Sequence, residues 1–433
     1  MKTLLDLSAR FIDENLYEGP FSVNRVSMQL APITEGIAMV EAFSHVVVFD
    51  TGDGLVAFDT SLEPMNQGIL RGIRTWSDAP VHTVAYTHGH IDHIGGARAF
   101  VDEARSRGDR DPRFIGHRGV IARFDRYQST NGYNRIINER QFSTLGKVLL
   151  GGSLDGRFGP KDWVRPDVTF DDRMSVRVGE LTFHLFHDRG ETDDHLWAWV
   201  PEKKALVVGD FVTWVFPNAG NPQKVQRYPG EWARALRTMA SYPAELLLPA
   251  HGLPVGGADR IQRVLGDLAT ALESLVEQTL ARMNEGMPLN QILMEVKVPE
   301  ELMERPYLRP AYDEPEFVVR NIWRLYGGWY DGNPAHLKPP SDSSVAKELA
   351  SLCGGAVALA ERAVALRDSD PRLACELAQM AFLATPDDAA VHAARAEVFR
   401  ARRDSELSLM AKGIFGTAAS ESEARKKALE AEG

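Results

Sequence analysis

The ten residues Thr-His-Gly-His-Ile-Asp-His-Ile-Gly-Gly, from Thr87 to Gly96, hold four potential metal ligands within six positions. Residues 81–86 ahead of this motif are rich in β-branched and aromatic side chains, which predicts a strand, and residues 97–105 behind it predict a helix. The motif therefore lies on a strand-to-helix loop. Imidazole nitrogens and carboxylate oxygens are ligands that zinc and similar divalent ions prefer. Because the loop offers more ligands than one tetrahedral ion needs, we expect two ions; the ligands are His88, His90, Asp92 and His93.

The pattern of these ligands is more informative than any one of them. A single loop histidine is more often solvated than metal-bound, but His-x-His-x-Asp-His between a strand and Gly-Gly resembles the signature of the metallo-β-lactamase superfamily. The resemblance implies an α/β fold in which two face-to-face sheets are covered by helices on both sides, an αββα sandwich. We expect the ligands to gather at one edge of that sandwich, where the strands end.

The resemblance implies three further ligands later in the chain. Glu191 occupies a position where most of the superfamily has a histidine, Asp210 stands where the metal-bridging carboxylate is found, and His251 is the last ligand. Asp210 and His251 both come at the end of apolar runs that predict strands.

A glutamate at position 191, nineteen residues ahead of the bridging carboxylate, resembles the alkyl sulfatases within this superfamily. Those enzymes usually bridge the metals with Glu, whereas this chain has Asp210. Residues 305–335 and 354–387 resemble the start and the continuation of the alkyl sulfatase dimerisation domain, so the resemblance covers about residues 30–430.

The same resemblance implies two zinc ions per chain. The implied ligands are His88, His90 and Glu191 for one ion, Asp92, His93 and His251 for the other, and Asp210 as the bridge. A hydroxide that bridges the ions would attack the ester, because two close cations lower the pKa of a bound water towards neutrality. Asp92 and Asp210 are the side chains expected to act directly in catalysis.

Two further residues are predicted to lie beside the metal ligands. Asp59 ends the predicted strand 55–60, where the superfamily has an aspartate that supports the metal loop, although the spacing fits a plain turn carboxylate equally well. His195, four residues after Glu191, is expected to hydrogen-bond a ligand, with a role as an alternative ligand as the second possibility.

Polar and basic side chains in two segments are candidates for holding a sulfate group. The first segment is the polar stretch 113–150, where an ordinary surface loop is the alternative. The second is the turn 217–228 after the bridging carboxylate, where solvated surface charge is the alternative. The candidates are Tyr133, Asn134, Arg135, Lys224 and Arg227.

The length and composition predict two domains. A chain of 433 residues is too long for one ordinary core, and from about residue 261 long stretches rich in Ala, Leu, Glu and Arg recur at helical spacing. We predict a catalytic domain over residues 1–262 and an all-α dimerisation domain over residues 263–433. The helices of the second domain resemble two or three tetratricopeptide-like pairs.

Charge and apolar patterning limit the partners and the location. The net charge is −11, with 60 acidic and 49 basic residues, which argues against a nucleic-acid partner. No apolar run approaches the roughly 18 residues of a membrane span, and the N-terminus does not resemble a secretory signal, so we expect no membrane partner and a cytoplasmic protein. The cysteines, Cys353 and Cys375, are expected to be reduced core residues.

Together these features predict a homodimeric, zinc-dependent hydrolase of small-molecule sulfate esters, with dimerisation through the C-terminal helical domain. Alkyl sulfatases usually continue into a sterol-carrier-like domain, which we expect this chain to lack. That expected absence and Asp210 both favour an alternative, a hydrolase of the same fold that cleaves a carboxylic ester, a lactone or a phosphate ester. A third hypothesis is a non-catalytic scaffold in which the metals are structural and the helical half binds a partner.

Overall fold

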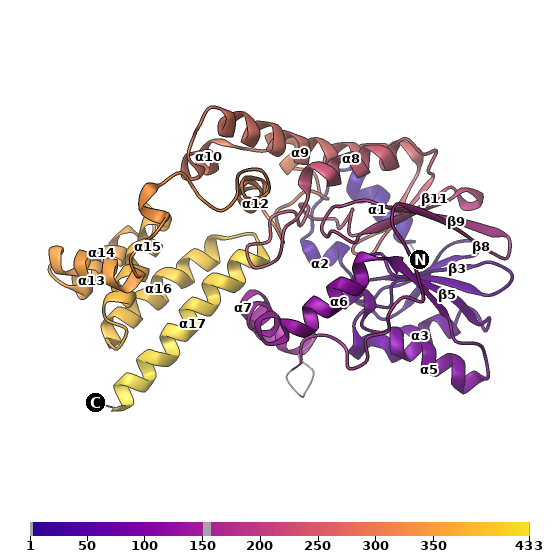
Figure 1. The fold of residues 1–433 in the computed structure, drawn as a ribbon, viewed down its shortest axis with the longest axis horizontal. Helices are drawn as coiled ribbons and strands as arrows, with labels where there is room; N and C mark the ends of the chain where they lie inside the picture. Colours follow the sequence, from indigo (N-terminus) through magenta and orange to yellow (C-terminus); the bar gives the residue numbers. More distant parts are fainter. Residues whose placement is uncertain (1–2, 150–156, 433) are drawn as a thin grey trace. The chain divides into compact units, whose positions relative to one another are not determined.

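The structure is a computed structural model that describes residues 3–149 and 157–432 (Figure 1). The chain forms two compact units: the first comprises residues 1–136 and 147–328, and the second comprises residues 137–146 and 329–433. The units do not divide at the predicted boundary after residue 262, because this position lies inside a long helix, residues 258–284, that packs within the first unit. The division into homologous domains at residue 262 stays a prediction.

Two mixed sheets form the centre of the first unit. The first sheet consists of β1 (Leu30–Thr34), β2 (Ile37–Val40), β3 (Val46–Asp50), β4 (Leu55–Phe58), β5 (Val81–Ala85), β6 (Arg113–His117) and β7 (Val168–Phe170), paired in that order. The second sheet has the order β13 (Val255–Gly256), β12 (Leu246–Pro249), β11 (Ala205–Gly209), β10 (Leu196–Val200), β9 (Leu181–His187) and β8 (Arg173–Val178).

The helices of the first unit join and cover these sheets. They are α1 (Leu4–Asp13), α2 (Pro20–Val23), α3 (Asn66–Arg74), α4 (Ile91–Ile94), α5 (Ala97–Arg107), α6 (Gly119–Ser129), α8 (Pro229–Ala240), α9 (Ala258–Asn284), α10 (Leu289–Glu295), α11 (Glu300–Met303) and α12 (Pro315–Gly327), with the 3₁₀ helices η1 (Glu63–Met65) and η2 (Pro201–Lys203). Helix α7 (Asn131–Leu149) contributes residues to both units.

Three apolar layers hold the first unit together. Side chains from both sheets, such as Phe49, Phe58 and Phe183, fill the space between them. Helices α3, α5 and α6 cover the outer face of the first sheet, and α8 and α9 cover the outer face of the second (Figure 1). Strands with both faces buried, such as β4 and β11, are apolar throughout for this reason. The predicted αββα sandwich is confirmed.

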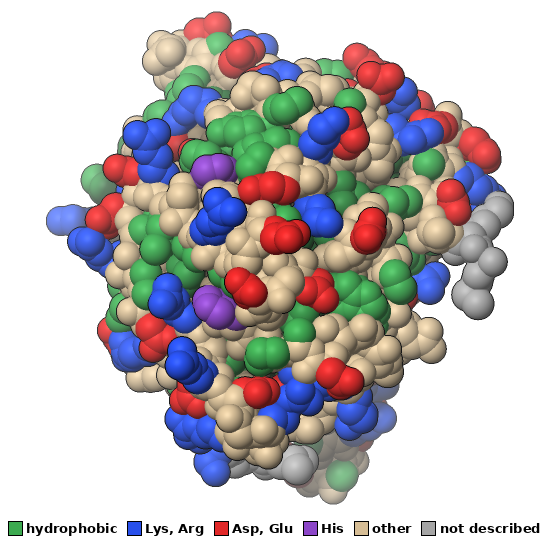
Figure 2. Space-filling view, turned by 90° about the vertical axis from the view of Figure 1, so that its right-hand side faces the viewer, with side chains coloured by type: hydrophobic (Ala, Val, Ile, Leu, Met, Phe, Trp, Pro, Cys, Tyr) green, Lys and Arg blue, Asp and Glu red, His purple; other side chains and the backbone are tan. Residues whose placement is uncertain are grey.

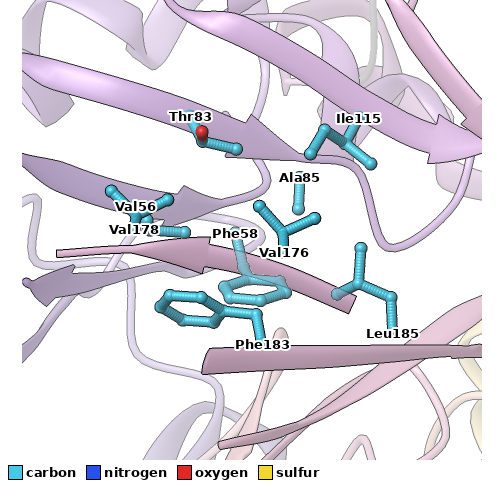
Figure 3. A pocket seen from close by; sticks show the side chains of 9 residues that line it. All are labelled: Val56, Phe58, Thr83, Ala85, Ile115, Val176, Val178, Phe183 and Leu185. Atoms are coloured by element: carbon cyan, nitrogen blue, oxygen red, sulfur yellow. The ribbon is translucent and has the colours of Figure 1, made fainter. Parts of the chain in front are cut away.

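The void drawn in Figure 3 belongs to the interface between the two sheets. It is lined by Phe58, Phe183, Leu185 and other apolar side chains, with Thr83 as the polar member of the lining. An apolar void of this kind inside a core stays dry, and its lining holds no charged group that could bind a substrate. It is therefore a packing feature of the sandwich.

The parallel strand pairs decide where the polar side chains meet. Strand β4 runs parallel to β5, and β11 runs parallel to β12. Because parallel strands end at the same edge of a sheet, Asp59 after β4 lies beside the motif after β5, and Asp210 after β11 lies beside His251 after β12.

On the face shown in Figure 2, Lys and Arg side chains are interspersed with Asp and Glu, so neither sign of charge dominates this face.

The second unit is helical in its described part. Its helices are α13 (Asp342–Leu352), α14 (Ala356–Leu366), α15 (Pro371–Ala384), α16 (Ala389–Ser405) and α17 (Leu409–Glu432), preceded by η3 (Pro334–His336). The stretch 345–367 forms two helices because Gly354 and Gly355, at φ +86° and +114°, break it. Small alanines at the contacts, such as Ala360, Ala378 and Ala381, allow α14, α15 and α16 to pack closely.

Among the described residues, no single helix has the length and apolar character needed to cross a membrane; the bent pair α13 and α14, at 89°, meets that test only when the two are taken together. Both cysteines are free. Cys375 is half-buried, but Cys353 is exposed at the end of α13, so the prediction that it is a core residue was wrong.

Candidate metal centre

The histidine-rich motif begins after β5 and passes through the short helix α4 before α5 begins. In the described part of the chain there are two groups of side chains that could hold a metal ion, and within each group the possible ligand atoms all lie within 4.8 Å of one another. The groups are His88, His90, Glu191 and Asp210, and Asp92, His93 and His251. The structure thus brings together all seven side chains that the sequence nominates, from four separated segments. Their role as ligands remains a prediction.

Asp210 lies between the two groups. Its Oδ2 is 3.9 Å from His88 Nε2, and its Oδ1 is 3.4 Å from His93 Nε2. The same Oδ1 lies 3.7 Å from His251 Nε2, and Asp92 Oδ2 lies 3.3 Å from that nitrogen. One carboxylate therefore faces both groups, as a bridging ligand must.

Burial controls the protonation of these histidines. Burial is the largest cause that lowers the pKa of His88 and of His90. The charge of His93 lowers the pKa of His88 further, and the charge of Arg227 lowers that of His90 further. A neutral imidazole is the form that binds a metal. Burial also lowers the pKa of His93, but nearby carboxylates, Asp210 foremost, outweigh burial and raise that pKa well above its usual value. The carboxylates thus attract positive charge to this position.

The residues present fit divalent cations. His93 Nε2 and Asp210 Oδ1 are buried and have no hydrogen-bond partner among the described residues. Such atoms are costly in a folded protein unless something satisfies them. The surrounding donors are histidine nitrogens and carboxylate oxygens, which suit zinc and related ions. A pair of cations would satisfy both orphaned atoms.

Gly209 allows Asp210 to approach the histidines. Its φ of +50° lies in the left-handed region, and a Cβ there would be 2.7 Å from His195 Cε1 and 2.8 Å from Thr87 Cβ. The backbone of β11 therefore passes against the motif with no room for a side chain.

Asp59 supports the motif from behind. Its Oδ1 accepts a hydrogen bond from Thr87 N at 2.7 Å, and its Oδ2 accepts from Thr87 Oγ1 and from His93 Nδ1, both at 2.8 Å. Asp59 has φ +64°, a strained value for a residue with a side chain, and such strain persists where surrounding contacts fix it. The carboxylate thus orients His93 so that its Nε2 faces Asp92 and Asp210.

Asp59→Asn should weaken zinc binding by about 10- to 100-fold, because the amide cannot accept all three of these hydrogen bonds. Titration of the metal-free protein with Zn²⁺ against a chromophoric chelator measures this. Asp50→Asn is the matched control, since Asp50 ends the neighbouring strand β3 and accepts a hydrogen bond from Gly52 N at 3.1 Å, which an amide oxygen also accepts. Equal affinities in the two variants would contradict the supporting role of Asp59.

His195 uses both ring nitrogens within the protein. Its Nε2 accepts a hydrogen bond from Asp210 N at 3.1 Å, and its Nδ1 donates to Leu196 O at 3.0 Å. Burial lowers its pKa to about 3, so it is neutral, as these two bonds require. It also stacks on His88, with ring centroids 4.5 Å apart. His195 therefore positions Asp210 and His88, and has no free nitrogen for a metal.

Glu191 is held by two groups from the turn after β11. Asn218 Nδ2 donates a hydrogen bond to Glu191 Oε1. Arg227 Nη1 donates to Glu191 O and lies 3.4 Å from Oε1. Burial raises the pKa of Glu191 well above its usual value, and Arg227 opposes that rise. Arg227 is 1% exposed, so its charge is not a solvated surface charge.

The other candidate substrate-binding residues lie in different surroundings. Arg135 and Tyr133 are exposed, and Asn134 Nδ2 donates to Thr130 O within the same helical turn. These residues are on α7 and not on a surface loop, as α6 and α7 occupy most of the stretch 113–150. Residue 150 lies outside the described residues. Lys224 is half-buried, with Nζ 5.9 Å from the ring of Phe158.

Several residues near the site are not singled out by any sequence pattern described above. Tyr312 is close enough for Glu191 and Asp92 to raise the pKa of its hydroxyl, although burial is the larger cause. Others are Ser44, Arg123, Asp194, Asn218 and Asp313. Two of them had a signal in the sequence: Asp194 lies three residues after Glu191, and Asn218 lies in the turn 217–228. No recognisable motif adjoins the others.

An αββα sandwich that gathers histidines and carboxylates at one edge of its sheets has the side chains that a site for metal-assisted hydrolysis needs. The family described as the metallo-beta-lactamase superfamily matches residues 40–251, and the family described as alkyl sulfatase dimerisation matches residues 288–425. Residues 40–251 thus form a metallo-beta-lactamase domain, and residues 288–425 form an alkyl sulfatase dimerisation domain. The first family implies a dinuclear metal site, and the second suggests a homodimer.

The chain is homologous to alkylsulfatases. It is 26% identical to a linear primary-alkylsulfatase of a Pseudomonas species over 84% of this chain and 69% of the relative. An (R)-specific secondary-alkylsulfatase of Pseudomonas sp. is 27% identical over 82% of this chain and 56% of that protein. The solved structure of a stereoselective inverting sec-alkylsulfatase from Pseudomonas sp. aligns with a TM-score of 0.81 and 23% identity, over 91% of this chain and 65% of that chain. The chain thus spans between about half and two thirds of the length of these proteins.

Proposed function

We propose that this protein is a dinuclear zinc hydrolase that cleaves sulfate esters of small molecules. The observation that carries the proposal is Glu191, a glutamate in the first ligand group that is held by the buried Arg227. When bound, the ions supply Lewis acidity and a water activated near neutral pH. His88, His90 and Glu191 are proposed to hold one ion, Asp92, His93 and His251 the other, and Asp210 both.

Positive side chains beside the first ligand group suit an anionic ester. Arg227 presents a guanidinium, which pairs well with tetrahedral oxyanions through two N–H groups. Its Nε is buried without a hydrogen-bond partner in the described part of the structure, so it has a donor to offer. Burial lowers the pKa of Lys224 to about 7, and the nearby positive charge of Arg227 adds to this effect. We assign Arg227 as the principal sulfate contact and Lys224 as a second one.

Tyr133, Asn134 and Arg135 are retained as weaker substrate-binding candidates. Tyr133 and Arg135 are exposed on α7, and Asn134 donates hydrogen bonds to Thr130, the residue just before this helix. Arg135→Ala is therefore expected to change the rate less than removal of Arg227.

A second candidate function is hydrolysis of a carboxylic ester, a lactone or a phosphate ester. The observation that favours it is Asp210, which stands where alkyl sulfatases usually have the longer Glu. Zinc-loaded protein, assayed side by side with alkyl sulfates, carboxylic esters and phosphate monoesters, tests both functions. We expect sulfate release to have the highest kcat/KM. Preferential turnover of a neutral ester would replace the first function by the second, and no turnover of any ester would favour a scaffold with structural metals.

The identity of the ions is tested by elemental analysis. Two zinc ions per chain are expected in protein purified without added metal, and dialysis against a chelator should abolish hydrolysis until Zn²⁺ is restored. A content of one ion, or activity that survives metal removal, would contradict the dinuclear proposal.

We also propose that the protein is located in the cytoplasm.

We propose that two copies associate through the second unit. Helix α13 carries three exposed apolar side chains on one face, Val345, Leu349 and Leu352, with exposed fractions of 37%, 39% and 75%. Apolar residues grouped in this way on a helix mark an interaction surface. The face lies within the matched dimerisation domain, which is why a second copy is the proposed partner.

The double variant Leu349→Glu/Leu352→Glu should weaken dimerisation by about 100-fold or more, since each buried leucine contributes roughly 1.5–3 kcal/mol. Light scattering after size exclusion measures the mass. The matched control, Lys347→Gln/Ser351→Glu, makes the same change of two negative units at exposed positions on the opposite face of α13 and should leave the dimer intact. A dimeric double variant would show that another surface carries the association.

A further inference from the structure

Arg123 and Asp194 form a buried ion pair behind the first ligand group. Arg123 lies on α6 and is 2% exposed, and Asp194 follows Glu191 and is 0% exposed. Arg123 Nε donates to Asp194 Oδ2 at 2.8 Å, and Arg123 Nη2 donates to Asp193 Oδ1. Burial alone would raise the pKa of Asp194, but Arg123 outweighs burial and lowers it, so the pair is ionised at neutral pH.

This pair touches the backbone between two predicted ligands. Gly89, which separates His88 from His90, donates its N–H to Asp194 Oδ2 at 3.1 Å. A Cβ on Gly89 would lie 2.9 Å from Arg123 Cδ and 2.9 Å from Asp194 Oδ2. The peptide that joins the two histidines is therefore pressed against both members of the pair, and glycine is required there.

The segment that carries Asp194 also carries the other half of the same ligand group. Glu191 is three residues before Asp194, and the next residue, His195, accepts a hydrogen bond from the backbone N of Asp210 at 3.1 Å. One short segment thus contacts Gly89, provides Glu191 and supports Asp210. Helix α6 fixes it from outside, since a Cβ on Gly119 would lie 2.9 Å from Asp194 Cβ.

We propose that the Arg123–Asp194 pair is a positioning device that sets the distance between the His88–His90 turn and Glu191, and thereby the affinity of the first metal position. The proposal rests on the metal site of the proposed function. Arg123 and Asp194 do not contact the ion; they act through Gly89 and through the segment 191–195.

The test compares zinc binding in variants that keep or remove the pair. Arg123→Met alone leaves Asp194 as a buried unpaired charge and risks unfolding. The main variant is therefore Arg123→Met/Asp194→Asn, which removes both charges and keeps similar side-chain volumes. We expect one of its two zinc ions to bind about 10- to 100-fold more weakly, as is usual when an outer-shell partner of a ligand is lost. Arg123→Lys keeps the charge and one donor and should restore part of that loss.

Three further measurements separate positioning from general stability. Arg118→Met removes an exposed ion pair with Asp171 (2.7 Å) just before α6 begins and should bind zinc like the unmodified protein. The absorption of the Co²⁺-loaded double variant should differ from that of the unmodified protein, because the ligand geometry changes. The melting temperature of the metal-free double variant shows whether the fold is intact.

A folded double variant that binds both ions with unchanged affinity and an unchanged Co²⁺ spectrum would overturn the proposal. If the double variant loses both ions in step with a lower melting temperature, and Arg123→Lys gives no rescue, the pair is structural only, and the proposal is also overturned. Failure of the unmodified protein to bind two ions, or to cleave any ester when loaded, counts against the proposed function instead.

Discussion

Asp210→Asn is expected to lower kcat/KM for a sulfate ester by roughly 10³-fold and to reduce the zinc content below two per chain, because a lost bridge removes several kcal/mol of charge stabilisation from both ions. Asp210 is the carboxylate that faces both ligand groups, with Oδ1 3.4 Å from His93 Nε2 and Oδ2 3.9 Å from His88 Nε2. In the variant one of these oxygens becomes an NH₂ group, which repels a cation. Steady-state kinetics and elemental analysis of the same preparation measure the two effects.

Two further variants make the result specific to the bridge. Asp210→Glu restores the residue that alkyl sulfatases usually carry and is expected to retain both ions and most of the activity. Asp188→Asn is the matched control, since Asp188 accepts a hydrogen bond from Trp197 Nε1 at 2.9 Å, which an amide oxygen also accepts. Two zinc ions and full activity in Asp210→Asn would show that this side chain is not the bridge.

Arg227→Met should lower kcat/KM for a sulfate ester by about 10²- to 10³-fold, as expected when a buried charge pair loses one partner worth roughly 2–5 kcal/mol. Two causes contribute. The variant removes the guanidinium proposed to bind the sulfate, and it leaves the buried Glu191 without the group that lies 3.4 Å from its Oε1. Kinetics with a charged and a neutral ester separate them, because only the charged ester needs the anion contact.

The loss for a sulfate ester should therefore exceed the loss for a carboxylic ester of similar size. Arg324→Met is the matched control. Arg324 is an exposed arginine on α12 that donates a hydrogen bond at 2.9 Å to Oε1 of Gln226, the residue before Arg227. Its replacement should leave both rates within about threefold, as for most surface substitutions. An equal loss for both esters in Arg227→Met would assign Arg227 to holding Glu191 alone.

The candidate metal cluster is predictable because its residues stand in short, recognisable stretches of the sequence. Four of the candidate ligands stand within six residues of one another, and the remaining three each follow a strand, so the resemblance to one superfamily nominates all seven from the order of residues alone. The sandwich follows from the same motif. Parallel pairing of β4 with β5 and of β11 with β12 then brings the strand ends together.

The helices are less predictable where composition misleads. The polar stretch that forms α6 and α7 has the composition of a loop, because Asn and Gly are poor helix formers, although its Arg residues favour a helix. The stretch 345–367 has the periodicity of one helix, and Gly354 and Gly355 break it. In the first case the packing of side chains such as Val120 and Phe124 in the core stabilises α6. In the second case a pair of glycines ends the helix, which periodicity alone does not predict.

The αββα class and the seven side chains of the candidate cluster can be predicted from the order of residues, because the ligands are spaced on one loop and at the ends of predicted strands. The contacts that hold those side chains in place depend on the packing of distant elements. Arg123 reaches Asp194 from 71 residues away, and Asn218 reaches Glu191 from 27 residues away. Such contacts arise from the packing of one element on another, which leaves no periodic or local trace in the chain.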